Sequence, residues 1–281
     1  MIRIITDSAA DFTAGELKQL HLTAVPLQIV FGEDTYEDGV TLTPDIFWSR
    51  LTSGENPKTS QPSPEAFLTH FEAAKAAGDS VVCVLLSSAL SGTVQSATLA
   101  RSMIDYDDIH IVDSLQAATA EKFLVLRACQ LRDEGQLSAA ELAEALRSFT
   151  KRIRLYACLD TLDYLARGGR IPQAAATLGS LVQLKVIVTI TGEGKVGMAG
   201  KGMGMHRSAA ALIKLIQQHQ IDERFTPLPI FTHTPENCFA LVKKLGALGI
   251  ACREEDASPV GATISTHVGP GVFGLVFAEK E

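Results

Sequence analysis

The stretch Val81-Val82-Cys83-Val84-Leu85-Leu86-Ser87-Ser88-Ala89-Leu90-Ser91-Gly92-Thr93 decides the fold class. Its first residues form an apolar run rich in β-branched side chains, which is typical of a strand buried on both faces. Small polar residues follow, and a helical pattern begins at Thr93 and continues to Ile104. A strand that leads through a short polar loop into a helix is the unit from which parallel α/β sheets are built.

The same alternation extends in both directions from this stretch. Short apolar runs predict further strands at Ile2–Thr6, Ala24–Val30 and Ile109–Val112. Helical patterns lie between and after them, at Glu16–Leu20, Thr43–Leu51, Pro64–Ala77, Ala117–Glu134 and Ala139–Thr150. We therefore expect an N-terminal α/β domain whose sheet is mostly parallel and is covered by helices on both faces.

The rest of the chain predicts a second α/β domain. We place the boundary near residue 155, so that the domains span residues 1–155 and 156–281. The expected strands are Arg154–Leu159, Val186–Thr191, Lys195–Ala199, Leu228–Thr232, Ala262–Ser265 and Val272–Phe277. The expected helices are Thr161–Ala166, Ser208–Gln218 and Glu236–Leu248. Gly192-Glu193-Gly194 predicts the turn of a hairpin between two of the strands.

Composition excludes several classes of protein. With 46% hydrophobic and 20% charged residues, the chain of 281 residues is too apolar to be disordered and long enough to bury a large core. The net charge of −7 gives no electrostatic support for binding nucleic acid or an anionic membrane. No apolar run approaches the roughly 18 residues of a membrane span, and Met1–Ser8 lacks the pattern of a signal peptide. The 5 scattered cysteines argue against a disulfide framework or a structural zinc site, so we expect a cytoplasmic protein.

Four polar clusters follow predicted strands or lie in glycine-rich loops: Thr6–Asp11, Pro57–Pro64, Leu86–Thr93 and Ser265–Gly271. In open α/β sheets, ligands bind beyond the carboxyl ends of the strands. A structural interpretation competes with each cluster, because Asp, Ser and Thr also cap helices. Ser63 before Pro64 fits a cap, and Ser91 could cap the helix that begins at Thr93. No spacing of His, Cys or carboxylate residues suggests a metal site.

Six groups of residues, taken together, resemble the DegV family of bacterial fatty-acid-binding proteins. They occur in the family's order from residue 6 to residue 271 and are Thr6–Asp11, Pro57–Ser63, Leu90–Thr93 with Gln95–Ala97, Val112–Ser114, Leu162–Leu165 with Gly168–Ile171, and Thr266–Gly271. Any one of these matches would be weak, whereas all of them in order are specific.

The resemblance implies two α/β domains with one long-chain fatty acid held between them. It implies that the hydroxyls of Thr59 and Ser91 bind the carboxylate of the acid. A supporting polar network is expected from Ser60, Ser88, Gly92, Thr93, Thr266 and His267. The protein itself would not be an enzyme and would need no cofactor. It would present the acid to a separate fatty acid kinase, which converts the carboxylate to an acyl phosphate for phospholipid synthesis.

One segment departs from the family's pattern. Relatives carry a basic stretch where this chain has Lys201-Gly202-Met203-Gly204-Met205-His206-Arg207, and Met203 stands where an arginine is usual. This departure puts docking of the kinase in that region in doubt. The apolar segments Ile171–Val188 and Val272–Phe277 offer material to line a tunnel for the acyl chain.

Two other functions remain open at this stage. Ser91 could be the nucleophile of an acyl hydrolase or transferase, with His267 as its base and Asp7 or Asp113 as the orienting carboxylate. Alternatively, the helix that begins after Ser91 could bind the phosphate of a small molecule or nucleotide. The glycine-rich fingerprint of phosphate loops is absent, which disfavours the second alternative.

Overall fold

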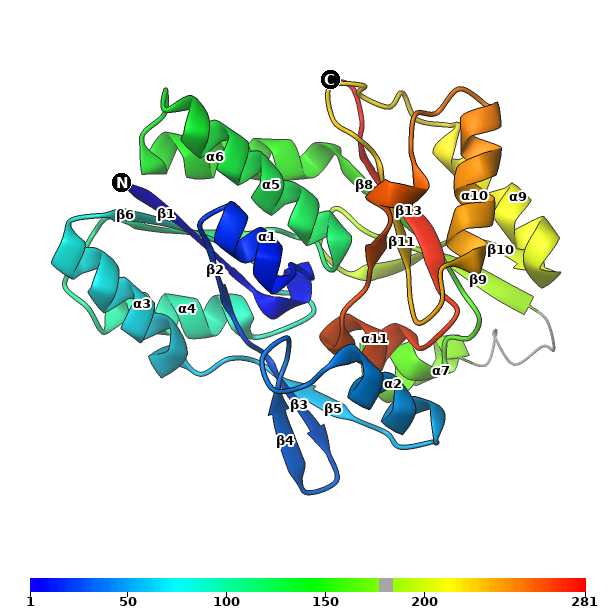
Figure 1. Cartoon of the computed structure of the whole chain (residues 1–281), viewed down its shortest axis with the longest axis horizontal. Coiled ribbons are helices and arrows are strands. Elements are labelled where there is room, and N and C mark those ends of the chain that lie inside the picture. Colours follow the sequence, from blue (N-terminus) through cyan, green and yellow to red (C-terminus); the bar gives the residue numbers. More distant parts are fainter. Residues whose placement is uncertain (177–183) are drawn as a thin grey trace. The chain divides into compact units, whose positions relative to one another are not determined.

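The computed structural model describes residues 1–176 and 184–281 of the chain. It divides into two compact units, Met1–Lys151 and Arg152–Glu281, each with helices and strands (Figure 1). The α/β class expected from the sequence is therefore confirmed. The predicted boundary at residue 155 falls inside β8 (Ile153–Leu159), the first strand of the second unit. The division into independently folding domains stays a prediction.

The first unit is built on a parallel sheet. Its strands are β1 (Ile2–Asp7), β2 (Leu22–Val25), β6 (Ser80–Leu85) and β7 (Ile109–Asp113), in the order β2-β1-β6-β7. Every neighbouring pair is parallel, as the sequence predicts. The interior position of β6 in this sheet explains its apolar sequence, because its residues from Val81 to Leu85 are all 0% exposed.

Helices cover both faces of this sheet (Figure 1). The helices of the first unit are α1 (Ala14–Gln19), α2 (Pro44–Thr52), α3 (Pro64–Ala77), α4 (Thr93–Ser102), α5 (Thr119–Glu134) and α6 (Ala139–Phe149), with short 3₁₀ turns at Ser8–Ala10 and Thr150–Arg152. Phe67 and Phe71 of α3 pack in one core with Val81, Cys83 and Leu85 of β6. Ser63 caps α3 and Pro64 occupies its first turn, which confirms that structural interpretation.

The prediction of one strand over Ala24–Val30 is wrong. The chain forms β2 and then leaves the parallel sheet for a second sheet with the order β4-β3-β5, made of β3 (Gln28–Phe31), β4 (Asp34–Glu37) and β5 (Lys58–Ser60). Pro26 lies between β2 and β3. Proline has no backbone N–H to donate to a ladder, so the apolar run is divided at this point. Both pairs of the small sheet are antiparallel.

The second unit contains a mixed sheet in the order β10-β9-β8-β13-β11-β12. Besides β8, its strands are β9 (Leu184–Ile190), β10 (Val196–Met203), β11 (Leu228–Phe231), β12 (Ser258–Pro259) and β13 (Phe273–Ala278). Only β11 and β12 pair in parallel among these described strands. The predicted hairpin of β9 and β10 is confirmed.

Five helices of the second unit are described: α7 (Asp163–Arg167), α8 (Gln173–Ala176), α9 (Gly204–Ile216), α10 (Glu236–Ala247) and α11 (Ala262–Val268), together with a 3₁₀ turn at Glu254–Asp256. Leu212 of α9 and Leu241 of α10 pack in one core with Leu275 and Phe277 of β13. This core fixes the positions of the strand ends and of the loops that follow them.

The predicted strand at Ala262–Ser265 is also wrong, because these residues begin helix α11. Their β-branched side chains favour a strand locally. Packing overrides this preference, since Thr263, Thr266 and His267 share one buried helical face. The hydroxyl of Thr266 also donates to the carbonyl oxygen of Ala262 one turn earlier, at 2.9 Å.

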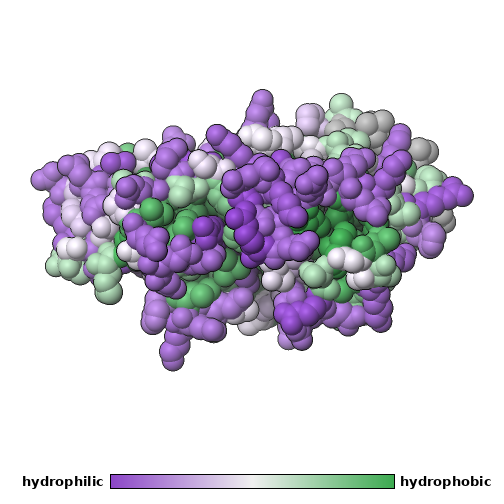
Figure 2. Space-filling view, turned by 90° about the horizontal axis from the view of Figure 1, so that it is seen from above, coloured by the Kyte–Doolittle hydropathy of each residue, from purple (hydrophilic) through white to green (hydrophobic). Residues whose placement is uncertain are grey.

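Hydrophilic side chains cover most of the surface that Figure 2 shows, and apolar side chains appear between them in separate groups. All five cysteines are buried and free. Over residues 1–176 and 184–281, no helix is both long enough and apolar enough to cross a membrane. Residues 177–183, which belong to the apolar segment Ile171–Val188, lie outside the described residues, so the tunnel lining stays a prediction.

Candidate functional site

Thr59 lies on a strand and not in the irregular loop that its prolines predict. It is the middle residue of β5 and pairs with Ile29 of β3. Thr59 is half-buried, whereas its neighbours Lys58 and Ser60 are exposed. Ser60 makes only a long side-chain contact with Gln28, at 3.5 Å. The small sheet therefore gives Thr59 a backbone position that is fixed by a ladder of hydrogen bonds.

Ser91 forms a hydroxyl pair with Thr93 at the start of α4. Their oxygens, Oγ and Oγ1, are 2.9 Å apart. Thr93 is fully buried, and Ser91 is half-buried. The cap of α4 is Gly92, with no side-chain capping bond, so the structure does not support a capping role for Ser91. The backbone N–H of Ser91 donates to the carbonyl oxygen of Ser87 at 3.1 Å, which folds the loop tightly after β6.

The side chain of Gln61 connects these two segments within the first unit. Its amide donates to the hydroxyl of Ser96 on α4 at 3.0 Å. Its Oε1 lies only 1.9 Å from the point that a Cβ on Gly92 would occupy. The side chain of Gln61 therefore packs on the backbone of Gly92, in the space that a side chain on residue 92 would fill. Through this contact, the segment that carries Thr59 is held against the loop that carries Ser91.

Ser88 has a structural partner in the same loop. Its hydroxyl donates to a carboxylate oxygen of Asp113, at the end of β7, and its backbone N–H bonds the other oxygen at 3.2 Å. The backbone N–H of Leu115 also donates to Asp113, at 3.0 Å. Asp113 therefore ties together the loops that follow two neighbouring strands. The place of Ser88 in a supporting network around the ligand stays a prediction.

Asp7 and Glu121 form a fully buried pair of carboxyl groups beside the parallel sheet. Asp7 accepts hydrogen bonds from the backbone N–H of Ala9 at 3.0 Å and of Leu86 at 2.8 Å. Burial raises the pKa of Asp7 to about 6, although these two bonds and one to Glu121 act to lower it. Burial, and then the charge of Asp7, raise the pKa of Glu121 well above its usual range. The pair therefore retains a proton, with Glu121 as the group that holds it.

His267 lies on α11 of the second unit and packs directly on Gly168. A Cβ on Gly168 would lie 2.1 Å from Nδ1 of His267. Burial, followed by the nearby charge of Arg170, lowers the pKa of His267 to about 4, so that its ring is neutral at pH 7. The ring of Tyr164 rests on Gly269 in the same way, where a Cβ would lie 2.4 Å from the ring. These two contacts hold the Tyr164–Arg170 segment against His267 and the loop that follows it.

The predicted site residues fall into two groups. Thr59, Ser60, Ser88, Ser91, Gly92 and Thr93 belong to the first unit, and Thr266 and His267 belong to the second. The contact of Gln61 with Gly92 brings most of the first group together. The structure gives Thr266 a partner in its own helix. The expected place of His267 in the network around Ser91 stays a prediction.

The model of the DegV family, described as "Uncharacterised protein, DegV family", matches residues 1–280. The chain belongs to the DegV family. It is 33% identical to "DegV domain-containing protein TTE1491" of Caldanaerobacter subterraneus, with 99% of each chain covered. Among solved structures, it is similar to "Fatty Acid Binding of a DegV family Protein from Thermus thermophilus", with 30% identity, a TM-score of 0.87 and 99% of each chain covered. It is also similar to "DegV, a fatty acid binding protein from Bacillus subtilis", with 27% identity, a TM-score of 0.83 and 99% of each chain covered.

The arrangement in this DegV chain disfavours the predicted acyl hydrolase. Both carboxylates that could orient a catalytic base have other partners, since Asp7 accepts two backbone bonds and Asp113 holds Ser88 and Leu115. Within the described residues of the first unit, the hydroxyl of Ser91 bonds that of Thr93 and no base. A serine nucleophile needs an adjacent base that can take its proton.

The basic segment that departs from the family's pattern bridges β10 and α9 of the DegV fold. Met203 ends β10 and is 47% exposed, so an apolar side chain stands at the surface where the resemblance led us to expect an arginine. Lys201, His206 and Arg207 are exposed as well. A role of this surface in docking stays a prediction.

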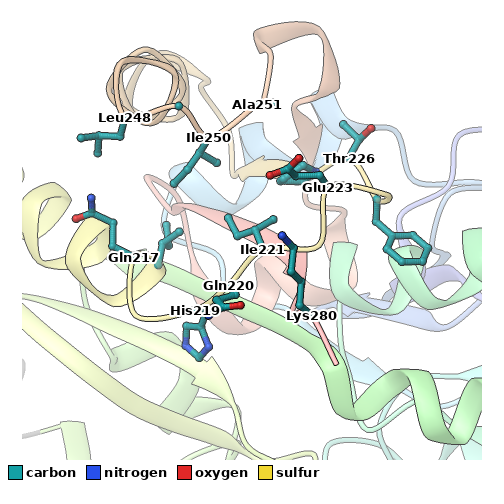
Figure 3. Close-up of a pocket in the computed structure, with 14 residues that line it drawn as sticks. Gln217, His219, Gln220, Ile221, Glu223, Thr226, Leu248, Ile250, Ala251 and Lys280 are labelled. Atoms are coloured by element: carbon teal, nitrogen blue, oxygen red, sulfur yellow. The ribbon is translucent and has the colours of Figure 1, made fainter.

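A separate pocket of about 660 Å³ lies in the second unit. Figure 3 shows it between the ends of α9 and α10 and the loop that joins α9 to β11, with Lys280 beside it. Apolar side chains such as Ile221 and Ile250 share its lining with polar ones such as Gln217 and Glu223. No residue of the predicted site lines this pocket. Over the described ranges, no group of three or more His, Cys, Asp or Glu side chains could hold a metal ion.

Three residues that matter for the site were not assigned a role from the sequence. Gln61 and Arg170 lie inside quoted motifs, but the contacts that they make join distant segments. Glu121 lies in the first turn of α5, between Ala120 and Lys122. An acidic residue within a run of buried positions is the one signal that could have marked Glu121.

Proposed function

We propose that this DegV protein binds a long-chain fatty acid and holds its carboxylate on the hydroxyls of Thr59 and Ser91. The proposal rests on the number of hydroxyl protons that Ser91 and Thr93 can donate. Two hydroxyls share one hydrogen bond, and the described residues provide no second partner for either. One hydroxyl proton is therefore left for an acceptor from outside the chain. Thr93 is fully buried, so Thr93 donates to Ser91 and Ser91 donates to the ligand.

A carboxylate is the acceptor that fits best. Hydrogen bonds to charged acceptors contribute on the order of 1.5–3 kcal/mol each, about twice the value of bonds between neutral groups. Bonds in a chain strengthen one another, and the Thr93–Ser91–carboxylate sequence is such a chain. Because the anchor consists of hydroxyls, it satisfies the oxygens of the ligand without placing a buried cation beside them.

The acyl chain supplies most of the affinity. A sixteen-carbon tail has about 14 methylene groups, and each contributes roughly 0.8 kcal/mol when it leaves water. The gross gain of about 11 kcal/mol is reduced by the cost of immobilising the tail. Micromolar binding requires about 8 kcal/mol, so it is within reach even before the carboxylate contributes. The names of similar structures from Thermus thermophilus and Bacillus subtilis, which describe fatty acid binding, support the same ligand class.

The resemblance to the DegV family supports a wider role. We propose that the protein is a carrier and not an enzyme, and that a separate fatty acid kinase phosphorylates the carboxylate while the acid is bound. In that step, a carboxylate oxygen attacks the terminal phosphorus of ATP, and ADP leaves. An anchor of hydroxyls leaves the carboxylate oxygens more nucleophilic than a bidentate arginine pair would. Formation of acyl phosphate from the loaded protein, ATP and a fatty acid kinase tests this part.

The ligand itself is tested by denaturing extraction of the purified protein, followed by mass spectrometry of what is released. We expect an unmodified long-chain fatty acid from the wild-type protein. Thr59→Ala and Ser91→Ala should each weaken binding of the delipidated protein to palmitic acid about tenfold, because each loses one bond to a charged acceptor. Thr98→Ala is the matched control, since Thr98 is exposed on α4 and its hydroxyl donates to the carbonyl oxygen of Val94 in its own helix.

A different outcome would count against the proposal. Release of a phosphorylated small molecule would favour the phosphate-binding alternative. Labelling of Ser91 by a fluorophosphonate probe would favour the hydrolase. Equal affinity of wild type, Thr59→Ala and Ser91→Ala would remove both hydroxyls from the carboxylate site.

A further inference from the structure

We propose that Gln61 is a positioning residue that sets the spacing between the hydroxyls of Thr59 and Ser91, and that it does so by packing on the backbone of Gly92. The inference rests on the proposed function, because it concerns how the carboxylate site is held. Gln61 comes directly after β5, the strand that carries Thr59. Its side chain reaches the start of α4, where Ser91 lies, and bonds Ser96 there.

The contact of Gln61 with Gly92 is closer than any side chain on residue 92 would permit. A Cβ at Gly92 would lie 1.9 Å from Oε1, 2.6 Å from Cδ and 2.8 Å from Nε2 of Gln61. The amide group of Gln61 therefore occupies the space that a side chain on residue 92 would fill. Beyond this contact, its Nε2 donates to the hydroxyl of Ser96, which is 3% exposed. The amide is held at both ends of its plane.

The backbone of Gly92 does not itself require glycine. Its φ of −78° and ψ of 11° are angles that alanine also adopts. Space is the reason for glycine at this position, and Gln61 occupies that space. The two residues therefore form one unit, in which the absent side chain of Gly92 makes room for the amide of Gln61.

This unit determines the geometry of the carboxylate site. A ligand that accepts a bond from Thr59 and another from Ser91 needs both hydroxyls at a fixed separation, because its two oxygens are held rigidly by one carbon. Thr59 is fixed by the β3–β5 ladder, and Ser91 is fixed by the turn after β6. Gln61 joins these two supports. Misplacement of a binding group by a fraction of an ångström weakens hydrogen bonds whose strength depends on distance and angle.

The test uses delipidated full-length protein and two ligands, palmitic acid and its methyl ester. The ester keeps the acyl chain but has no charged carboxylate. Gln61→Ala should weaken binding of palmitic acid about tenfold and binding of the ester much less, so that the preference for the acid falls. A purely structural role of Gln61 would weaken both ligands alike. Far-UV circular dichroism and the fluorescence of Trp48 check that the variant is folded.

A double-mutant cycle tests whether Gln61 acts through its contact with Gly92. Gly92→Ala alone should reduce the preference for palmitic acid as much as Gln61→Ala does, because the new Cβ displaces the amide. In the Gln61→Ala background, Gly92→Ala should change the affinity for palmitic acid by less than about twofold, since the space is then empty. Equal effects of Gly92→Ala in both backgrounds would overturn the inference, as would an unchanged acid preference in Gln61→Ala.

The proposed function fails in a distinguishable way. If the wild-type protein binds the acid and the ester equally, the carboxylate is not recognised, and the proposed anchor is wrong whatever the variants do. If the wild type prefers the acid and Ser91→Ala loses that preference while Gln61→Ala keeps it, the anchor stands and the positioning role of Gln61 is refuted.

Discussion

The Glu121→Gln variant is expected to gain stability over the wild-type chain as the pH rises from 5 to 7, by at most about 1.4 kcal/mol per pH unit. Glu121 is fully buried beside Asp7, and its pKa is raised well above the usual range, first by burial and then by the charge of Asp7. The folded chain thus holds a proton that the unfolded chain releases above pH 4.5. The glutamine side chain keeps a donor for Asp7 and an acceptor for Thr6 without holding a titrating proton.

The sign follows from the balance of protons. A carboxyl group with a raised pKa contributes its stability fully below the pKa of the unfolded state, and this contribution is lost as the pH rises. Each retained proton corresponds to about 1.4 kcal/mol per pH unit. The charged groups around the pair are Asp11, Asp38 and Lys122. They are unchanged in the variant, so their own titration largely cancels in the comparison.

Urea denaturation at pH 5, 6 and 7 measures this difference. Trp48 is the one tryptophan of the chain and lies on α2, so its fluorescence reports unfolding of the first unit. Glu16→Gln is the control of opposite sign. Its bond with Lys122 lowers the pKa of Glu16 against the opposing effect of burial, so wild type should keep a constant advantage over this variant from pH 5 to 7 and lose it only in a further measurement below about pH 4.5. Parallel curves for wild type and Glu121→Gln would show that Glu121 holds no extra proton.

The Gly168→Ala variant is expected to lose about 3 kcal/mol of stability in the second unit, at the upper end of what overpacking costs. The new Cβ would lie 2.1 Å from Nδ1 and 2.8 Å from Cε1 of His267, so the ring must leave its place. Backbone strain does not contribute, because Gly168 has a helical φ of −74° and ψ of −7°. The loss comes from displacing a ring that is buried on its helix.

Gly246→Ala is the matched control. Gly246 lies in α10, and a Cβ there would meet no atom within 4 Å. Alanine favours a helix over glycine by up to about 1 kcal/mol, so this variant should be slightly more stable than wild type. Unfolding followed by circular dichroism compares the two variants. Destabilisation of both variants, or of neither, would contradict the inference that His267 packs on Gly168.

The Gly168→Ala variant has a second readout at His267. In the wild-type chain, burial keeps the pKa of His267 at about 4, so its ring signals in the NMR spectrum should not titrate between pH 5.5 and 8. Displacement by the added methyl group exposes the ring to water, and its pKa should rise towards the ordinary value near 6.5. A ring that still fails to titrate near neutral pH in the variant would mean that it has stayed buried.

The sequence predicts three strands of the parallel sheet well, because β1, β6 and β7 are short apolar runs. Ser63 and Pro64 place the start of α3 correctly, and Thr93 begins α4 as expected. The failures occur where a local signal competes with a distant one. Pro26 divides an apolar run that hydrophobicity alone joins. The β-branched residues of Ala262–Val268 become helical because one face is buried.

The candidate site is predictable only in part. Motifs mark Thr59, Ser91 and His267 as polar residues in loops, but they do not say which neighbour holds each one in place. The decisive contacts are those of Gln61 with Gly92 and of His267 with Gly168, and each joins segments that are separated in the chain. The burial of Glu121 depends on how α5 packs on the sheet, which no local pattern reports.

Gly92 and Gly168 are required for the space above them, since Gln61 and His267 occupy the places of the missing side chains. In each such pair, replacement of the glycine by a larger residue is blocked, whereas replacement of the opposite residue by a smaller one is not. A small residue opposite the glycine must be in place before any larger residue can replace the glycine itself. Evolution or directed mutagenesis of this protein must therefore follow an ordered route at these positions, and libraries that vary the glycines alone will mostly sample misfolded or inactive chains.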